Sequence, residues 1–205
     1  PVGTTKYEKR GIAVSVPLWK HESCIQCNQC AYVCPHAAIR PYLAKDENLE
    51  FMPEGLAGKK AIGKEFVDHQ YFIQVSPLDC TGCGNCVDVC PSKPKSLVMA
   101  ELECVAGSEG AKFNYLEALP EPAVTYNPAT VKNSQFNKPL FEYSGACTGC
   151  GETPYIKLAT QLFGDRMMIA NATGCTSIFG GSAPSCPYTT NKDGHGPAWA
   201  NSLFE

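Results

Sequence analysis

The sequence lacks two features that would point to common classes of binding partner. Its 205 residues include 17 Lys and Arg against 20 Asp and Glu, a formal net charge of −3. Nucleic-acid binding depends on a positive field, so we expect no nucleic-acid partner. No stretch of about 20 apolar residues is present either, so we expect no membrane-spanning helix and no membrane partner. Histidine is scarce, and none of the four histidines has the spacing of metal ligands.

The amino-terminal segment also lacks the complete features of a secretion signal. Residues 11–19 (GIAVSVPLW) follow two basic residues, but no cleavage site of small residues comes after them. Apolar residues alternate in this segment as they do in a strand: Ile12, Val14, Val16 and Leu18. We therefore predict a strand, and a cytoplasmic protein whose thiols stay reduced. Because the chain starts at Pro1 rather than Met, we expect that its first natural residue is missing.

Cysteine, by contrast, is abundant, with 13 in the chain. The spacing C-x2-C-x2-C-x3-C occurs twice, each time followed by proline: Cys24, Cys27, Cys30 and Cys34, then Cys80, Cys83, Cys86 and Cys90. A disulfide framework is typical of small secreted domains, and the odd count argues against complete pairing. Structural zinc sites use separate C-x2-C pairs and rarely show this spacing. The pattern instead favours iron–sulfur ligation.

The doubled run resembles the ligand pattern of the bacterial two-cluster ferredoxins, in which thiolates hold two [4Fe–4S] clusters and the fourth cysteine of each run binds the other cluster. The resemblance implies one cluster on Cys24, Cys27, Cys30 and Cys90, and a second on Cys80, Cys83, Cys86 and Cys34. Each run lies in a similar unit of strand, cysteine loop and short apolar segment, which suggests a pseudo-twofold axis. In the second loop, Gly82 and Gly84 permit tight backbone around a cluster.

Composition and periodicity divide the rest of the chain. Residues 1–104 form the expected ferredoxin-like domain, in which residues 41–68 are a solvated insertion or, alternatively, a partner-docking surface. Residues 105–146 show neither helical nor strand periodicity, so we predict an extended connector that is packed by its aromatic residues. Cys104 and a later cysteine, Cys186, fall outside the ligand patterns, and we expect both to pack as small hydrophobic residues.

A new unit begins at residue 147. Thr153 is expected to cap a helix that starts at Pro154 and ends at Gly164. Its apolar face would consist of Tyr155, Ile156, Leu158, Ala159, Leu162 and Phe163. A short buried strand is predicted over residues 167–170. The loop that follows, residues 171–182, has little side-chain bulk and suits the close approach of a cofactor.

Three segments of this unit carry a further resemblance: ACTGCGETPYIKL, NATGCTSIFGG and GPAWANSLFE. Together with the twin cysteine runs they resemble pyruvate:ferredoxin oxidoreductase over essentially the whole chain. The resemblance implies an α+β segment of a longer polypeptide. It would comprise a 2[4Fe–4S] ferredoxin-like domain with an insertion, an extended connector, and over residues 147–205 the beginning of an α/β thiamine-diphosphate-binding domain. That family oxidatively decarboxylates pyruvate with coenzyme A, and passes the electrons to ferredoxin or flavodoxin.

The resemblance also assigns roles to residues after position 146. Cys147, Cys150 and Cys175 match three ligands of a third [4Fe–4S] cluster, and Glu152 and Cys175 match positions that contact thiamine diphosphate. The fourth ligand, the Mg²⁺-diphosphate segment and the pyruvate-binding residues would lie outside this chain. The segment alone would therefore be inactive and hold no catalytic residue, and the parent chain would be a homodimer.

Several alternatives stay open from the sequence. The cysteine runs fit a stand-alone polyferredoxin electron carrier equally well, and a zinc-ribbon protein is a third class. Cys186 could supply the fourth ligand of the third cluster. A carboxylate such as Glu152 in the first turn of a helix is also favoured by the helix dipole alone. The 2-oxo acid, the acceptor and the direction of flux are not determined by these residues.

Overall fold

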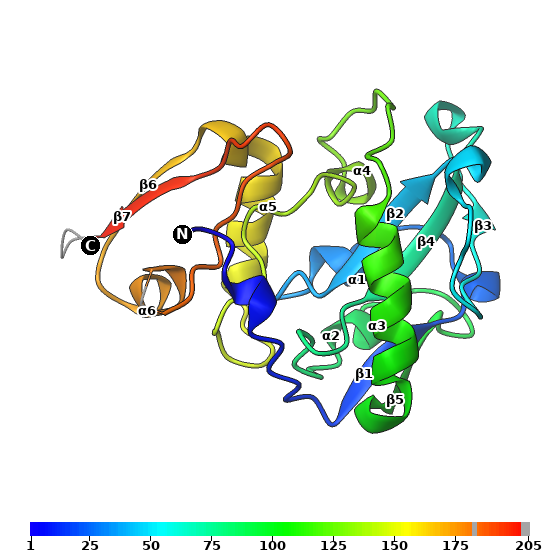
Figure 1. Cartoon of the computed structure of the whole chain (residues 1–205), viewed down its shortest axis with the longest axis horizontal. Helices are drawn as coiled ribbons and strands as arrows, with labels where there is room; N and C mark the ends of the chain where they lie inside the picture. The colour runs from blue at the N-terminus through cyan, green and yellow to red at the C-terminus, as the bar shows by residue number, and fades with distance from the viewer. Residues whose placement is uncertain (182–183, 202–205) are drawn as a thin grey trace.

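The computed structural model describes residues 1–181 and 184–201. Residues 15–101 contain two antiparallel strand pairs: β1 (Ser15–Trp19) pairs with β5 (Leu97–Glu101), and β2 (Ile39–Ala44) pairs with β4 (Gln70–Val75). A short strand, β3 (Lys59–Lys60), joins the other edge of β4. Figure 1 shows the two pairs on the right-hand side of the molecule.

The repeat predicted from the cysteine runs is present in the backbone. The first half runs from β1 through the helix α1 (Gln29–Tyr32) to β2, and the second from β4 through α2 (Asn85–Asp88) to β5. Each strand pair therefore takes one strand from each half, and α1 contacts α2. The first strand begins later than predicted, because Ile12 and Val14 lie ahead of β1 and are exposed.

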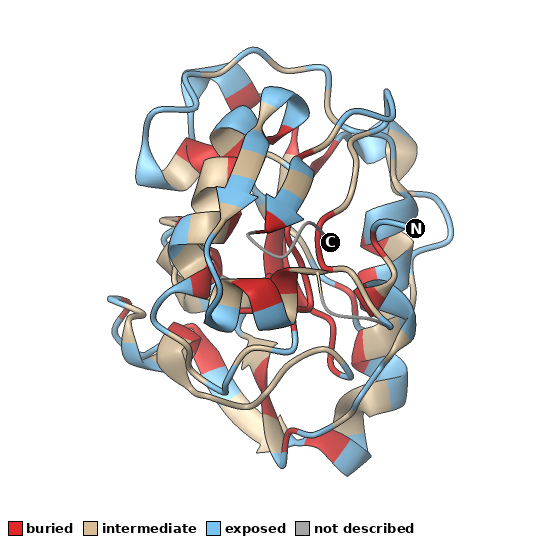
Figure 2. Cartoon of the chain, turned by 90° about the vertical axis from the view of Figure 1, so that its left-hand side faces the viewer, coloured by how far each residue is buried: buried red, intermediate tan, exposed pale blue. Residues whose placement is uncertain are grey.

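The core of this unit is built around the cysteines. Buried residues from both halves, including Ile39 of the first and Tyr71 and Leu97 of the second, pack against the partly buried thiols of Cys24, Cys30, Cys34 and Cys80. Buried residues gather towards the middle of the molecule and exposed residues at its periphery (Figure 2).

The insertion is more than a solvated loop. It contains two 3-10 turns, η3 (Asp46–Asn48) and η4 (Lys64–Phe66), besides β3. Leu56, Ala61 and Phe66 are buried, with Phe66 only 1% exposed. The expectation of a solvated insertion is therefore only partly correct, because these apolar side chains anchor an otherwise largely exposed segment on the core.

The expected extended connector is also wrong in its first part. Residues Leu102–Ala118 form α3, a helix of 17 residues that packs beside β4 and β5 (Figure 1). Its buried face combines Leu102, Phe113 and Leu116 with a carboxylate, Glu109, which accepts a hydrogen bond from Gln74 (2.6 Å). A charged residue in the buried stripe interrupts the apolar period that reveals a helix. The remainder, with the short α4 (Val131–Ser134), is packed by aromatic rings as predicted, for example Phe66 on Phe136 at 5.3 Å.

The carboxyl-terminal unit begins with the predicted helix, α5 (Thr153–Phe163), which starts one residue earlier than expected and has Glu152 at its N-cap position. After η5 (Gly164–Arg166), a strand is present as β6 (Met168–Asn171) and pairs in parallel with β7 (Ala198–Asn201). The expectation that this strand is buried is wrong, since none of its residues is fully buried and Met168 is 89% exposed. Most of the predicted cofactor loop is instead a helix, α6 (Cys175–Gly181). Two further turns are η1 (Thr5–Tyr7) and η2 (His21–Ser23).

The buried face of α5 is not the one predicted. Tyr155 and Phe163 of its apolar face are exposed, at 73% and 52%. The residues that α5 buries are polar: Thr153, Lys157, Thr160 and Gln161. Their hydrogen-bond partners include Leu140, whose N–H donates to the Thr160 hydroxyl, and Asn137, which exchanges two hydrogen bonds with Gln161. Figure 1 shows α5 between the ferredoxin-like unit and the β6–β7 pair.

One buried ion-pair network joins the strands to the segments outside them. Arg40 of β2 donates to Glu142 and to Glu117 of α3 (3.0 Å), and its guanidinium lies over the ring of Tyr143 at 5.1 Å. The Arg40 and Glu142 side chains are 7% and 6% exposed. The Arg40 charge lowers the pKa of Glu117, against the opposing effect of burial.

Replacing Arg40 by Met should strongly destabilise the chain, because Glu142 would lose its cation in a poorly solvated site and the partly exposed Glu117 would lose its ion pair. Breaking such a buried network costs about 3–5 kcal/mol. Arg166→Met is the matched control, since Arg166 pairs with Asp165 on the surface and such pairs contribute at most about 1 kcal/mol. Anaerobic calorimetry of both variants measures the effect, and equal falls in Tm would contradict it.

Candidate iron–sulfur centre

The two cysteine loops have the same backbone conformation. In the first loop Gln26 and Asn28 have positive φ (58° and 59°), and in the second Gly82 and Gly84 do (70° and 81°). In both loops the amide after the turn donates to the first cysteine: Gln26 N to Cys24 Sγ and Gly82 N to Cys80 Sγ, each at 3.4 Å. Amide N–H groups that point at sulfur favour the thiolate form, and they adjust the reduction potential of a bound cluster.

The sequence revealed the glycines of the second loop but not their counterparts in the first. Gln26 and Asn28 are 0% and 1% exposed. The Gln26 amide donates to Lys60 O (2.8 Å) and accepts from Ile62 N (2.7 Å). Alignment of the two runs residue by residue would have placed both amides opposite glycines, which is the signal for a left-handed position.

Asn28 links the first loop to two other parts of the chain. It donates to Lys132 O in α4 (2.7 Å) and accepts from the Tyr71 hydroxyl in β4 (2.6 Å). The insertion and the connector are thus hydrogen-bonded to the first loop through buried side-chain amides. The second loop has the amino-terminal segment beside it instead, with Ser15 and Ala13 against Gly82.

Four cysteines, one from the first run and three from the second, line a single small cavity: Cys34, Cys80, Cys83 and Cys86. Apolar side chains complete its wall, among them Pro17, Ile39, Val75 and Met99. The structure therefore brings together the crossed set that the ferredoxin resemblance implies. A small, mainly apolar cavity with several convergent sulfurs is a suitable environment for a cluster.

The cysteines of the other crossed set lie close enough to interact electrostatically. Burial raises the pKa of Cys30, and the nearby charges of Cys24, Cys27 and Cys90 raise it further. In the second set, burial likewise raises the pKa of Cys80 to about 12, with Cys34 and Cys83 adding to the rise and the Gly82 amide opposing it. Cysteine thiols must lose their protons to bind metal. Neighbouring buried thiolates repel one another, so cations between them would stabilise the group.

Cys90 differs from the other ligands. Although burial raises its pKa, hydrogen bonds from Ser96 and Ser92 outweigh that effect, and the net shift is downward. Within the described residues, no three His, Cys, Asp or Glu side chains converge as closely as one metal ion requires. In a cubane each iron takes its own thiolate, so the ligands need not converge on one point.

The three cysteines of the proposed third site are less tightly grouped. Cys147 and Cys150 form one turn, closed by a hydrogen bond from Cys150 N to Cys147 O (3.0 Å). Gly149 in this turn lies against the second set: a Cβ there would be 3.6 Å from the Cβ of Cys83. Cys175 begins α6, and no described interaction joins it to the turn. Glu152 is exposed and its side chain makes no capping hydrogen bond.

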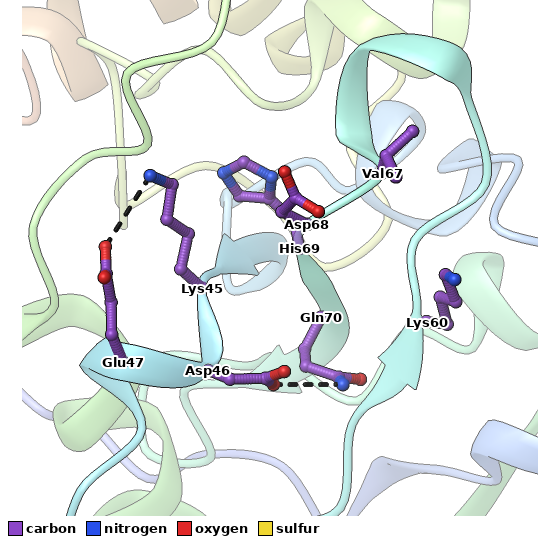
Figure 3. Close-up of a pocket in the computed structure, with 8 residues that line it drawn as sticks. All are labelled: Lys45, Asp46, Glu47, Lys60, Val67, Asp68, His69 and Gln70. Carbon is purple, nitrogen blue, oxygen red and sulfur yellow. Dashed lines mark hydrogen bonds and ion pairs between the residues drawn. The ribbon is translucent and has the colours of Figure 1, made fainter.

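The remaining thiols and one polar pocket lie outside these sets. Cys104 is exposed on α3, so the expectation that it packs is wrong, whereas Cys186 is partly buried. The pocket in Figure 3 is formed by the insertion and the adjoining strand ends, and it contains no cysteine. Two pairs of its side chains interact: Lys45 with Glu47 (3.6 Å), and Gln70, which donates a hydrogen bond to Asp46 (3.1 Å).

Comparison with known proteins agrees with this geometry. Residues 23–93, which include both cysteine runs, match the family model of the 4Fe-4S dicluster domain. Pyruvate:ferredoxin oxidoreductase from Moorella thermoacetica is 69% identical over 205 residues, which is all of this chain and 18% of that protein. The chain matches a segment of pyruvate:ferredoxin oxidoreductase.

Related oxidoreductases with other named acceptors match over the same length. The pyruvate-flavodoxin oxidoreductase of Enterobacter agglomerans is 60% identical over 205 residues, all of this chain and 17% of that protein. The pyruvate dehydrogenase (NADP(+)) of Cryptosporidium parvum is 55% identical over 206 residues, covering this whole chain and 10% of that protein. The chain thus spans less than a fifth of these relatives. None of its described helices is long and apolar enough to cross a membrane.

The two glycines of the second loop should differ in their tolerance of alanine. Both have positive φ, which costs a non-glycine residue about 1–2 kcal/mol. A Cβ at Gly84 meets nothing within 4 Å, but one at Gly82 would lie 2.9 Å from Ser15 O and 3.2 Å from Ala13 Cβ. Gly82→Ala should therefore lower Tm and iron content much more than Gly84→Ala. Equal losses in anaerobic preparations of the two variants would contradict this geometry.

Proposed function

We propose that this chain is the electron-relay segment of a thiamine-dependent pyruvate oxidoreductase. The observation that carries the proposal is the cavity lined by Cys34, Cys80, Cys83 and Cys86, since a cysteine of the first run meets three of the second. In the proposal these four hold one [4Fe–4S] cluster, and Cys24, Cys27, Cys30 and Cys90 hold the other. Residues 1–104 are the ferredoxin-like domain, to which α3 adds a covering helix.

The chemistry of the parent protein requires such a relay. When bound, thiamine diphosphate supplies the carbanion chemistry for decarboxylating a 2-oxo acid, whereas an iron–sulfur cluster accepts one electron at a time. Oxidation of a 2-oxo acid releases two electrons, so more than one cluster is useful. The chain's contribution is to hold the clusters, exclude water from them and set their order.

We further propose that residues 147–205 begin the thiamine-diphosphate domain. Cys147, Cys150 and Cys175 would bind a third [4Fe–4S] cluster, with a fourth ligand from elsewhere in the parent chain, and Glu152 and Cys175 would contact the thiamine. Mg²⁺ would bind outside this segment. The contact between Gly149 and Cys83 supports an order in which electrons pass from the third site to the Cys80 set and then to the Cys24 set.

The overall reaction proposed for the cytoplasmic, homodimeric parent protein converts pyruvate and coenzyme A to acetyl-CoA and CO2, with ferredoxin or flavodoxin as acceptor. The names of the relatives support the reaction, and they differ in the acceptor. Because segments that are 55–69% identical occur with three named acceptors, we infer that the relay itself is shared and that acceptor choice depends on other parts of the protein.

Crossed ligation can be tested by comparing three single variants. Cys34→Ala should remove the cluster of the Cys80 set, so its EPR spectrum after reduction should match that of Cys83→Ala. It should differ from that of Cys27→Ala, which removes the other cluster. Iron analysis should show a loss of about four irons in each variant. If Cys34→Ala instead resembled Cys27→Ala, each run would hold its own cluster.

Glu152→Gln in the parent protein tests the thiamine contact. We expect weaker thiamine diphosphate binding, measured by calorimetric titration, with nearly unchanged Tm. The matched control is Glu103→Gln, because Glu103 is an exposed carboxylate in the first turn of α3. A helix-dipole role is worth about 0.3–1 kcal/mol and would give both variants the same small fall in Tm. Normal thiamine affinity in Glu152→Gln would refute the contact.

A further inference from the structure

Lys157 is a buried cation that the cluster ligation does not use. It lies in the second turn of α5 and is 2% exposed. Its ammonium group reaches across to the first half of the ferredoxin-like unit, where it donates hydrogen bonds to three main-chain carbonyls. These belong to Ala31, Tyr32 (3.1 Å) and Cys34 (3.3 Å).

The three carbonyls favour the protonated form of the Lys157 side chain. An ammonium group has three N–H donors and no acceptor, and here each donor has one carbonyl. A neutral amine could satisfy only two of them. Among the ion pairs of the described residues, none joins Lys157 to a carboxylate, although buried charges are normally paired. Burial lowers the pKa of this ammonium group, and the nearby charges of Cys34 and Cys30 oppose that effect, while the three carbonyl dipoles accept its hydrogen bonds.

The place of this charge relative to the proposed clusters is specific. The three carbonyls belong to the segment from Ala31 to Cys34. Cys30, of the first set, precedes that segment directly, and Cys34, of the second set, ends it. Lys157 therefore lies on the short piece of backbone that connects a ligand of one proposed cluster to a ligand of the other.

We propose, resting on the proposed function, that Lys157 is a positioning residue that raises the reduction potentials of both clusters in the ferredoxin-like unit. Each cluster gains one electron and one negative charge when it is reduced, and a buried cation nearby favours that form. The cation comes from the helix that follows the Cys147–Cys150 turn. The beginning of the carboxyl-terminal unit would thereby set the potential of clusters that it does not bind.

The experiment is an EPR-monitored redox titration of the full parent protein carrying Lys157→Met, which removes the charge and keeps most of the side-chain length. We expect both clusters to become harder to reduce by at least tenfold in the equilibrium constant, which is 59 mV for a one-electron couple. Lys157→Arg, which keeps the charge, should have reduction potentials close to those of the unmodified protein. Lys64→Met is the control, because Lys64 is exposed and solvent should screen its charge.

The outcomes separate the inference from the proposed function. Unchanged potentials in Lys157→Met with full iron content would overturn the inference, and so would a shift of only one cluster. If neither Lys157→Met nor Lys157→Gln binds clusters, Lys157 serves the fold rather than the potential, and the inference again fails. Absence of both reduced-cluster signals from the unmodified protein would instead refute the proposed function.

Discussion

The pairing of strands from opposite halves is the constraint on which the rest of the structure depends. Because β1 pairs with β5 and β2 with β4, neither half can complete a sheet alone. Because of this pairing, each cysteine loop lies beside the end of the other half. There it is close to the fourth cysteine of the other run. Cys34 reaches the Cys80 cavity, and Cys90 reaches Cys30, for this reason. Metal binding and folding of the unit are therefore expected to be coupled.

The two cysteine loops adopt positive φ at equivalent positions but use different residues there. The second uses glycine where φ is positive, which leaves no side chain to make contacts. The first uses Gln26 and Asn28, whose buried amides hydrogen-bond to Lys60, Ile62 and Lys132. An unsatisfied buried amide costs about 1–3 kcal/mol, so these contacts hold the insertion and the connector firmly against the first loop. The two loops thus differ at the positions where the first loop contacts the insertion and the connector, two segments that have no counterpart in the other half.

Features that depend on neighbouring residues in the sequence could be predicted, whereas the buried faces of helices, which depend on tertiary packing, could not. Cysteine spacing indicated an iron–sulfur domain, which the match to the 4Fe-4S dicluster domain confirms, and Thr153-Pro154 indicated the start of α5 within one residue. The helix α3 was missed because Glu109 occupies its buried stripe, which hides the helical period. The buried face of α5 was predicted wrongly because distant hydrogen-bond partners satisfy most of its polar side chains, as Asn137 does for Gln161. No pattern within the helix reveals those partners.

The polar contact of α5 has a thermal consequence. Apolar burial weakens on cooling and contributes most of the heat-capacity change of unfolding, whereas burial of polar groups contributes with the opposite sign. Lys157, Thr160 and Gln161 dock α5 through hydrogen bonds, so this contact should lose little strength in the cold. The junction between the relay and the unit that follows it would then keep its geometry at temperatures where apolar interfaces loosen.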